Sequence, residues 1–342
     1  MTAKTVGAGE LLSPQQLAVV RERSDLRGTW LVVHAWGVIF LSMAMFAWFP
    51  NPLTFIAAVV LIGGRQLGLA ILMHDGAHGI LTKNQKLNMF LSQWFCAYPM
   101  LAETGAYRRY HLKHHANTQQ QEDPDLILSA PFPITKKSFR RKVVRDLTGQ
   151  TGYQQRKAQF LNAIGPSDWP LSQRLANFNK KLGKSALTNA ALFAILWAAG
   201  HPWYFVTLWV LPLLTWHQFI TRVRNIAEHA MVDDDDPFRY ARTTRAGLFM
   251  RAVLAPYWVN YHVEHHLMMW VPCYNLPRAQ AYLFANGFGE RMEIKDSYFD
   301  VIRMATSRPD SDDRPGELKH NARRRRVEGS MGEGFEPSQD AA

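Results

Sequence analysis

Nine of the thirteen histidines of this chain fall into four short clusters. Imidazole binds iron, copper and zinc, so these histidines are candidate metal ligands. In three clusters the histidines recur at a spacing of three or four residues, and in the fourth a single histidine follows an asparagine by four residues. Residues with these spacings lie on one face of a helix. The ten candidate ligands are His74, His78, His111, His114, His115, Asn225, His229, His262, His265 and His266.

The pattern His-x-x-His-His occurs twice, starting at His111 and at His262. In a chain of this length and histidine content, one copy is expected by chance only about 0.02 times. A zinc ion in a structural site has four ligands. Nine imidazoles are more than one such ion needs, so the sequence predicts a site for two metal ions. The two cysteines, Cys96 and Cys273, exclude a four-cysteine zinc site and a disulfide framework.

Long apolar segments precede or separate the histidine clusters. Four of them are expected to be membrane-spanning helices and cover residues 30–49, 53–73, 185–200 and 203–220. They form two close pairs, which predicts two hairpins. Because all the clustered histidines follow the spans or lie in the long polar segments, we expect them to converge on one site at one side of the membrane.

Basic residues are concentrated outside the predicted hairpins. Residues 102–184 hold 15 Lys and Arg and residues 221–342 hold 17, whereas the short links inside the hairpins hold none. Because basic loops remain in the cytoplasm, the site and both termini are expected on the cytoplasmic side of a bacterial inner membrane. The first apolar run is too long for the apolar region of a signal peptide.

The chain is expected to have three parts. Residues 1–29 form a cytoplasmic N-terminal segment, residues 30–307 form the membrane domain, and residues 308–342 have the composition of a disordered tail. Two shorter apolar segments, 87–101 and 247–259, are predicted to be interfacial helices. The net charge of +11 would suit a nucleic-acid binder, but the bunched apolar residues favour a membrane protein without a nucleic-acid partner.

Taken together, the motifs His74-Asp-Gly-Ala-His78, His111-Leu-Lys-His114-His115 and His262-Val-Glu-His265-His266, with the pair Asn225 and His229, resemble the membrane fatty-acid desaturase superfamily. That superfamily also contains hydroxylases and carotenoid ketolases. The resemblance runs from about Arg27 to Leu283. It implies an all-α membrane protein with four transmembrane helices in two hairpins and a cytoplasmic helical cap that holds a dimetal site. It also implies that the ten candidate ligands hold two iron ions (Fe²⁺), Asn225 through a water.

The resemblance implies an O₂-dependent desaturase that introduces a double bond into a fatty-acyl lipid or thioester. Unactivated C–H bonds have no acidic proton, so breaking them requires a metal-based oxidant. A carotenoid or lipid hydroxylase or ketolase needs the same oxidant and stays an alternative. From another class, a metal transporter or a non-catalytic lipid-binding protein stays open, although ligands gathered on one side of the membrane argue against transport.

The sequence contains no haem, flavin or iron–sulfur motif, so the electrons are expected from a separate ferredoxin, rubredoxin or cytochrome. Candidate docking residues for such an acidic carrier are Arg108, Arg109, Arg140 and Arg141. Asp75 and Glu264 lie inside histidine clusters. They are candidate acceptors for the second ring N–H of a metal-bound histidine.

Overall fold

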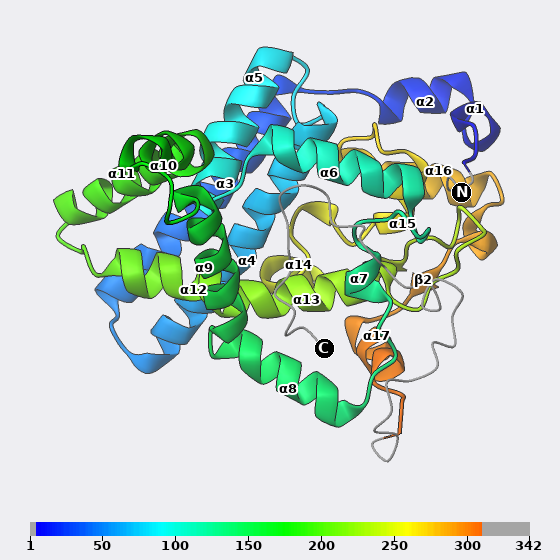
Figure 1. The fold of residues 1–342 in the computed structure, drawn as a ribbon. Coiled ribbons are helices and arrows are strands. Elements are labelled where there is room, and N and C mark those ends of the chain that lie inside the picture. Colours follow the sequence, from blue (N-terminus) through cyan, green and yellow to red (C-terminus); the bar gives the residue numbers. More distant parts are fainter. Residues whose placement is uncertain (1–4, 310–342) are drawn as a thin grey trace.

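The computed structural model describes residues 5–309, which are mostly helical (Figure 1). The longer helices are α3 (Asp25–Trp48), α4 (Pro52–His78), α6 (Thr104–Asn117), α8 (Lys136–Leu147), α9 (Gln150–Ile164), α11 (Lys184–Ala198) and α13 (Trp216–His229). The strands of the described part are β1 (Thr243–Thr244) and β2 (Ile294–Lys295), which pair in parallel. The predicted all-α class is therefore confirmed, and residues 310–342 of the predicted tail lie outside the described part.

The shorter helices connect these elements. They are α1 (Ala8–Leu11), α2 (Pro14–Val20), α5 (Gln85–Phe90), η1 (Leu91–Ala97), η2 (Tyr98–Met100), α7 (Leu126–Ser129), α10 (Leu171–Phe178), η3 (Asn179–Gly183), η4 (Phe205–Val210), α12 (Leu211–Leu214), α14 (Leu248–Val253), η5 (Pro256–Trp258), α15 (His262–Leu267), η6 (Cys273–Asn275), α16 (Leu276–Ala285), η7 (Gly289–Arg291) and α17 (Tyr298–Ala305). The two segments predicted to be interfacial are helical, as α5 to η2 and as α14 with η5.

Helices α3 and α4 are the two described helices that are long and apolar enough to cross a membrane, and they match the first two predicted spans. Their ends follow local chemistry. The Ser24 side chain caps α3, and Asn51 followed by Pro52 starts α4, where the missing proline N–H needs no partner. Gly79, at φ +76°, ends α4 in the left-handed conformation that glycine adopts without strain.

The second pair of predicted spans is less regular. α11 has 15 residues, and residues 205–229 form three consecutive helical segments, η4, α12 and α13. Pro212 has no N–H to donate within this stretch, and Thr215 leaves the helical region at φ −117° and ψ −89°. The structure therefore does not confirm four spans in two hairpins with a cytoplasmic cap, and this arrangement stays a prediction.

Helix α4 is the central element, and close packing around it depends on glycine. A Cβ on Gly76 would lie 2.1 Å from the Cβ of Ser92 on η1, and one on Gly63 would lie 2.7 Å from the Trp216 ring on α13. Real Cβ atoms do not approach other atoms so closely. The glycines therefore let η1 and α13 approach the helix that ends in His74 and His78.

The corner between α8 and α9 is attached to α13 by a buried carboxylate. Asp146 is fully buried and accepts hydrogen bonds from Arg222 Nε at 2.5 Å and Nη2 at 2.8 Å, and from Thr151 Oγ1 at 2.6 Å. Two N–H groups of the Arg222 guanidinium bond the two carboxylate oxygens of Asp146. This bidentate pair neutralises the buried charge and also fixes the orientation of the two side chains.

The N-terminal helices α1 and α2 lie against the C-terminal part of the chain, near α16 (Figure 1). Asn286 Nδ2 donates to the Leu11 carbonyl at 2.8 Å, and Asn275 Nδ2 donates to the carbonyls of Val20 and Glu22. The N-terminal helices are thereby joined to the segment of residues 275–286, which follows the histidine-bearing helix α15 in the chain.

Candidate metal centre

Four helices bring the nine clustered histidines together. His74 and His78 are on the last turns of α4, and His229 is the last residue of α13. The other two clusters lie on α6 and on α15. Because the spacings of three and four residues place each cluster on one helix face, every helix directs its imidazoles inward.

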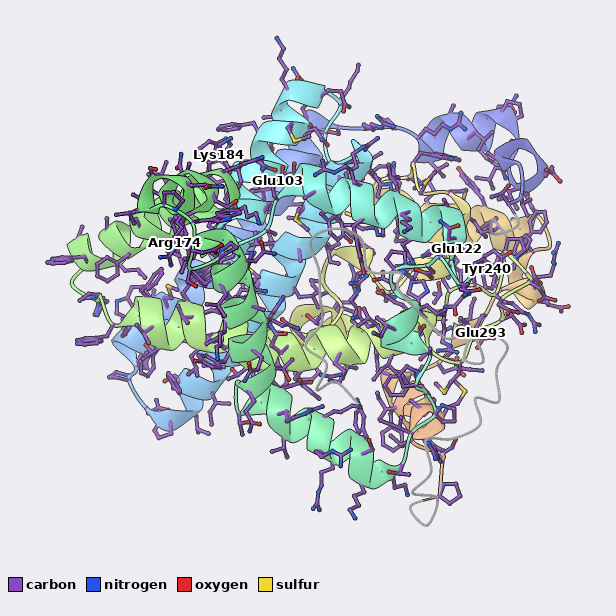
Figure 2. All side chains as sticks on the ribbon, viewed as in Figure 1. Glu103, Glu122, Arg174, Lys184, Tyr240 and Glu293 are labelled. Atoms are coloured by element: carbon purple, nitrogen blue, oxygen red, sulfur yellow. The ribbon has the colours of Figure 1, made fainter. Side chains whose placement is uncertain are left out.

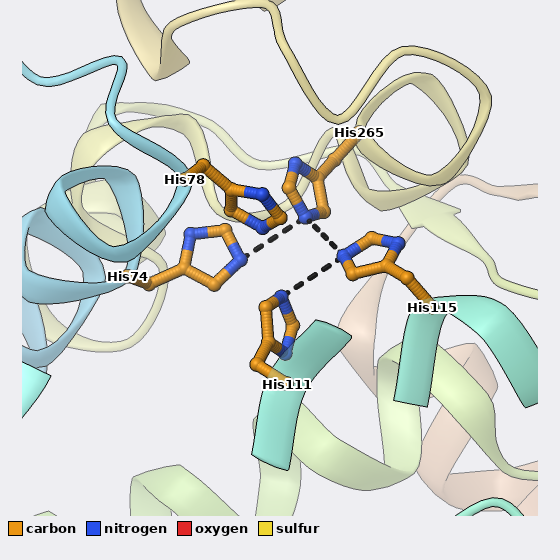
Figure 3. A group of neighbouring side chains, drawn as sticks. All are labelled: His74, His78, His111, His115 and His265. Atoms are coloured by element: carbon orange, nitrogen blue, oxygen red, sulfur yellow. Dashed lines mark hydrogen bonds between the residues drawn. The ribbon is translucent and has the colours of Figure 1, made fainter. Parts of the chain in front are cut away.

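Five histidines form the first group, and their ring nitrogens lie within 4.8 Å of one another (Figure 3). The Nε2 atom of His265 is 3.0 Å from Nε2 of His74 and 3.0 Å from Nε2 of His115. The Nε2 atoms of His115 and His111 are 2.9 Å apart. His78 completes the group, and its Nε2 is buried without a hydrogen-bond partner.

The remaining four histidines lie beside this group. Nε2 of His229 is 2.8 Å from Nε2 of His262, and Nε2 of His114 is 3.4 Å from Nε2 of His266. The ring centroids of His115 and His266 are 4.4 Å apart, which joins the second group to the first. The two groups thus lie next to each other, as two neighbouring metal ions require.

The donor set fits metal ions better than it fits mutual hydrogen bonds. A neutral imidazole has one N–H donor, so five rings that converge through Nε2 cannot all be satisfied by one another. A metal ion held between these rings would accept the Nε2 lone pairs that the rings cannot pair with one another. The buried Nε2 of His78 would thereby gain the partner that it otherwise lacks.

The electrostatics keep most of these rings neutral, which is the state that binds a metal. Burial, together with the neighbouring imidazoles, lowers the pKa of His111, His115 and His265 well below the usual value. Burial has the same effect on the pKa values of His262 and His266. These five rings therefore offer lone pairs, rather than protons, to the centre of the site.

Comparison with protein families agrees with this geometry. The family model described as fatty acid desaturase matches residues 48–291, which contain all ten candidate ligands. The chain belongs to the fatty acid desaturase family. Family members and relatives with desaturase names are oxidoreductases, and the histidine groups lie inside the matched region.

Named relatives of this desaturase-family protein differ in what their names say they act on. Dihydrorhizobitoxine desaturase of Bradyrhizobium elkanii is 29% identical over 249 residues, which is 70% of this chain and 69% of the relative. The sn-1 oleoyl-lipid 12-desaturase of Anabaena variabilis is 24% identical and covers 73% of each chain. Beta-carotene ketolase of a Paracoccus species is 24% identical, covering 73% of this chain and 87% of the relative.

Carboxylates and carbonyls contact the second nitrogen of several rings in this desaturase-family protein. Asp75 Oδ1 lies 3.4 Å from His74 Nδ1, and Asp123 Oδ1 lies 2.8 Å from His114 Nδ1. Burial lowers the pKa of His114, but Asp123 and Asp125 outweigh burial and raise it to about 9. Such contacts fix the ring orientation and hold the proton on Nδ1, so that a metal ion would bind at Nε2, in the case of His114 by displacing the second proton.

Glu228 and Asn225 lie on α13 close to His229. Glu228 Oε2 is 3.4 Å from His262 Nε2, and the carboxylate is held by Arg224 at 2.6 Å. Burial raises the pKa of Glu228 to about 7, although Arg224 opposes the shift. Asn225 is half-buried one helical turn before His229, so its role as a ligand through water stays a prediction.

The other sequence-predicted residues take different positions. Glu264 is fully buried, but its oxygens accept hydrogen bonds from Thr243 Oγ1 and Gln280 Nε2, each at 2.5 Å, rather than from a histidine. Arg108 donates to the carbonyl of Ala77 at the end of α4. α6, which carries Arg108 and Arg109, and α8, which carries Arg140 and Arg141, lie on opposite sides of α13 (Figure 1).

Sequence reasoning missed Asp123 and did not single out Glu228 from the other nearby acids. Asp123 reaches His114 only because the chain turns back after α6, where Gln119 has φ +62° and donates its backbone N–H to Asp123 Oδ2 at 2.8 Å. A spacing of nine residues carries no helical signal. Glu228 is next to His229 in the sequence, but nothing in the sequence shows that it faces His262.

Proposed function

We propose that this protein is an O₂-dependent desaturase that holds two iron ions in its histidine groups and introduces a double bond into a fatty-acyl chain. Its balanced reaction is R–CH₂–CH₂–R′ + O₂ + 2 e⁻ + 2 H⁺ → R–CH=CH–R′ + 2 H₂O. Iron, when bound, supplies the activation of O₂ that is needed to break unactivated C–H bonds. The observation that carries the proposal is the convergence of nine buried or half-buried imidazoles from four helices within the matched family region.

The residues of the chain have three tasks in this proposal. The ten residues from His74 to His266 named above bind the two ions, Asn225 through a water, and the burial of most of them limits the access of bulk water to the centre. Asp75 and Asp123 hold the Nδ1 proton of His74 and of His114, so that each Nε2 faces inward. Fixed ligands on four packed helices position the centre relative to one methylene pair of the bound chain.

An apolar substrate and a membrane location suit the outer surfaces of α3 and α4. Leu41 is 68% exposed, Trp48 73% and Leu53 78%, and these side chains are more stable against lipid than against water. We therefore place α3 and α4 in the bilayer, with the predicted inner-membrane location and cytoplasmic site kept as part of the proposal. One relative is named for oleoyl lipids, which supports an acyl substrate.

A carotenoid hydroxylase or ketolase is the second candidate, favoured by the Paracoccus ketolase that matches over most of its length. The name of the Bradyrhizobium relative gives dihydrorhizobitoxine as what it desaturates, so family membership alone does not select the substrate. Product analysis separates these reactions, because one removes two hydrogens and the other adds oxygen. A metal transporter or lipid-binding protein would form neither product.

The test expresses the chain with a ferredoxin and its reductase in a bacterial host supplied with saturated acyl chains, and profiles fatty acids by gas chromatography–mass spectrometry. The H111A/H115A variant removes two nitrogens of the first group. The H201A variant is the matched control, since His201 is exposed in the link after α11. We expect a new unsaturated acid from the natural chain and from H201A, and none from H111A/H115A.

Other outcomes would overturn the proposal in identifiable ways. A hydroxylated acid would retain the metal centre but change the reaction, and an oxygenated carotenoid in a carotenoid-producing host would favour the second candidate. An equal amount of unsaturated product from H111A/H115A would contradict the assignment of the metal ligands.

A further inference from the structure

Helix α6 presents two chemically different faces. At about 100° per residue, His111, His114 and His115 lie within one sector that faces the metal centre. Arg109 and Lys113 lie within about 30° of the direction opposite to the middle of that sector, one helical turn apart. Both side chains are exposed. We call this pair the α6 ridge.

Within the described part of the chain, the positive charges of the α6 ridge have no acidic partner. The sequence of α6, Thr104–Asn117, contains no Asp or Glu. Neither Arg109 nor Lys113 forms an ion pair with another residue of the described range 5–309. Glu103 and Glu122 flank the two ends of α6 rather than the ridge (Figure 2). Two free cations on one stripe therefore attract an acidic partner.

Arg108 has a different task, although it is the immediate neighbour of Arg109. It lies only about 60° from His111 around the helix, and it donates to the carbonyl of Ala77, next to His78. The Arg108 guanidinium thus provides a hydrogen-bond donor for one of the last carbonyls of α4, and this contact attaches α6 to α4. The positions Arg140 and Arg141 are exposed on α8, on the far side of α13 from α6 (Figure 1).

We propose that the α6 ridge is the docking surface for an acidic one-electron carrier protein that reduces the metal centre. The proposal rests on the proposed function. Two reduced carriers bind in turn, and each gives one electron and leaves oxidised. The two electrons that they deliver are the two that the overall reaction written above consumes in the reduction of O₂ to water.

The position of the ridge favours this partner over others. Only the thickness of α6, about 10 Å, separates a protein bound there from the ring nitrogens of His111 and His115. These two rings belong to the first group, and Tyr107 stacks on His111 with ring centroids 5.2 Å apart. An acidic carrier on α8 would face α13 and the α8–α9 corner instead.

The test compares two double charge reversals of equal size, R109E/K113E on the ridge and R140E/R141E on α8. Iron-loaded protein in detergent is mixed in a stopped-flow instrument with a reduced, acidic plant-type [2Fe–2S] ferredoxin, and separately with dithionite. We expect R109E/K113E to slow reduction by ferredoxin by a factor of about 10 or more at low salt, with the loss shrinking as salt rises. R140E/R141E should resemble the natural chain, and dithionite should reduce all three proteins equally.

Each other result has a defined meaning. Equal slowing by R109E/K113E and R140E/R141E, or no slowing by either, would overturn the ridge as the docking surface while leaving the desaturase proposal intact. If dithionite produces no change in the metal spectrum of the natural chain, the proposed function itself fails. If R109E/K113E instead loses binding to vesicles of anionic phospholipid and reacts normally with ferredoxin, the ridge binds lipid and the docking proposal is wrong.

Discussion

The surroundings of the second ring nitrogen distinguish His114 from the other clustered histidines. Its Nδ1 faces two acidic residues, Asp123 at 2.8 Å and Asp125 at 3.6 Å, and both His114 and Asp123 are buried. A buried charge-assisted hydrogen bond of this kind contributes about 1.5–3 kcal/mol, and it increases the basicity of the opposite nitrogen.

Asp123→Asn keeps the shape of the side chain and removes its charge. We expect the affinity for metal to fall by about 10-fold or more, because Nε2 of His114 becomes a weaker ligand. Titration of the metal-free protein with Fe²⁺ measures the effect, and thermal unfolding of the metal-free protein checks that the loop still folds. Asp125→Asn, whose carboxylate is more distant and 23% exposed, should cause a smaller loss. An equal loss from both variants would contradict the assigned role of Asp123.

At the level of single residues, the sequence was most informative about the imidazoles. Spacings of three and four residues placed His111, His114 and His115 on one face of α6, and the structure directs all three toward the centre. Asp123 was not predictable, because its contact depends on a loop that reverses direction at Gln119. Local periodicity describes one helix, whereas this contact depends on a turn between elements.

At the scale of elements, the contact between α4 and η1 depends on the absence of a side chain at Gly76. Gly76→Ala would bring a Cβ to 2.1 Å from the Cβ of Ser92, and such overpacking costs about 1–3 kcal/mol. Ser92→Gly removes the opposing atoms at a cost of about 1 kcal/mol. We expect the double variant to lose less unfolding free energy than the two single variants lose in sum, as measured by thermal unfolding in detergent. Simple additivity would show that the two helices do not depend on this close approach.

The α8–α9 corner offers a second test of how elements are joined. Asp146→Asn breaks a buried bidentate pair with Arg222, and removing one partner of a buried pair costs about 3–5 kcal/mol. Since Arg222 is 24% exposed, we expect a loss near the lower end of this range, measured as the free energy of unfolding. The matched control is Asp296→Asn, which breaks the exposed pair with Arg245 and should change stability by less than about 1 kcal/mol. Similar effects from both variants would contradict the role of burial.

The course of the helices was only partly predictable from hydropathy. The first two apolar runs became α3 and α4, because capping residues and a glycine mark their ends. The fourth run looks equally apolar in the sequence, yet the helix breaks at Thr215, between α12 and α13. Hydropathy measures transfer into lipid, and it contains no information about where tertiary packing bends the backbone.

At the scale of the whole molecule, the metal ions themselves should contribute to stability. A ligand that binds only the folded state adds about 4 kcal/mol when its concentration is a thousand times its dissociation constant. Nine imidazoles from four helices are the candidate ligands, so we expect a chelator to lower the unfolding temperature and added Fe²⁺ to restore it. The H111A/H115A variant should respond less. An unfolding temperature that does not depend on the chelator would show that the histidine groups hold no stabilising metal.

The contact between histidines of α4 and α15 also determines when, during synthesis of the chain, the histidine groups can form. His74 and His265 meet at 3.0 Å although 191 residues separate them. At a translation rate of about 5–20 residues per second, the earlier histidines are made roughly 10–40 s before their last partners. The histidine groups can therefore be completed only after α15 has left the ribosome. Any chain terminated before His262 would permanently lack three of the nine clustered imidazoles, however well its first helices were formed.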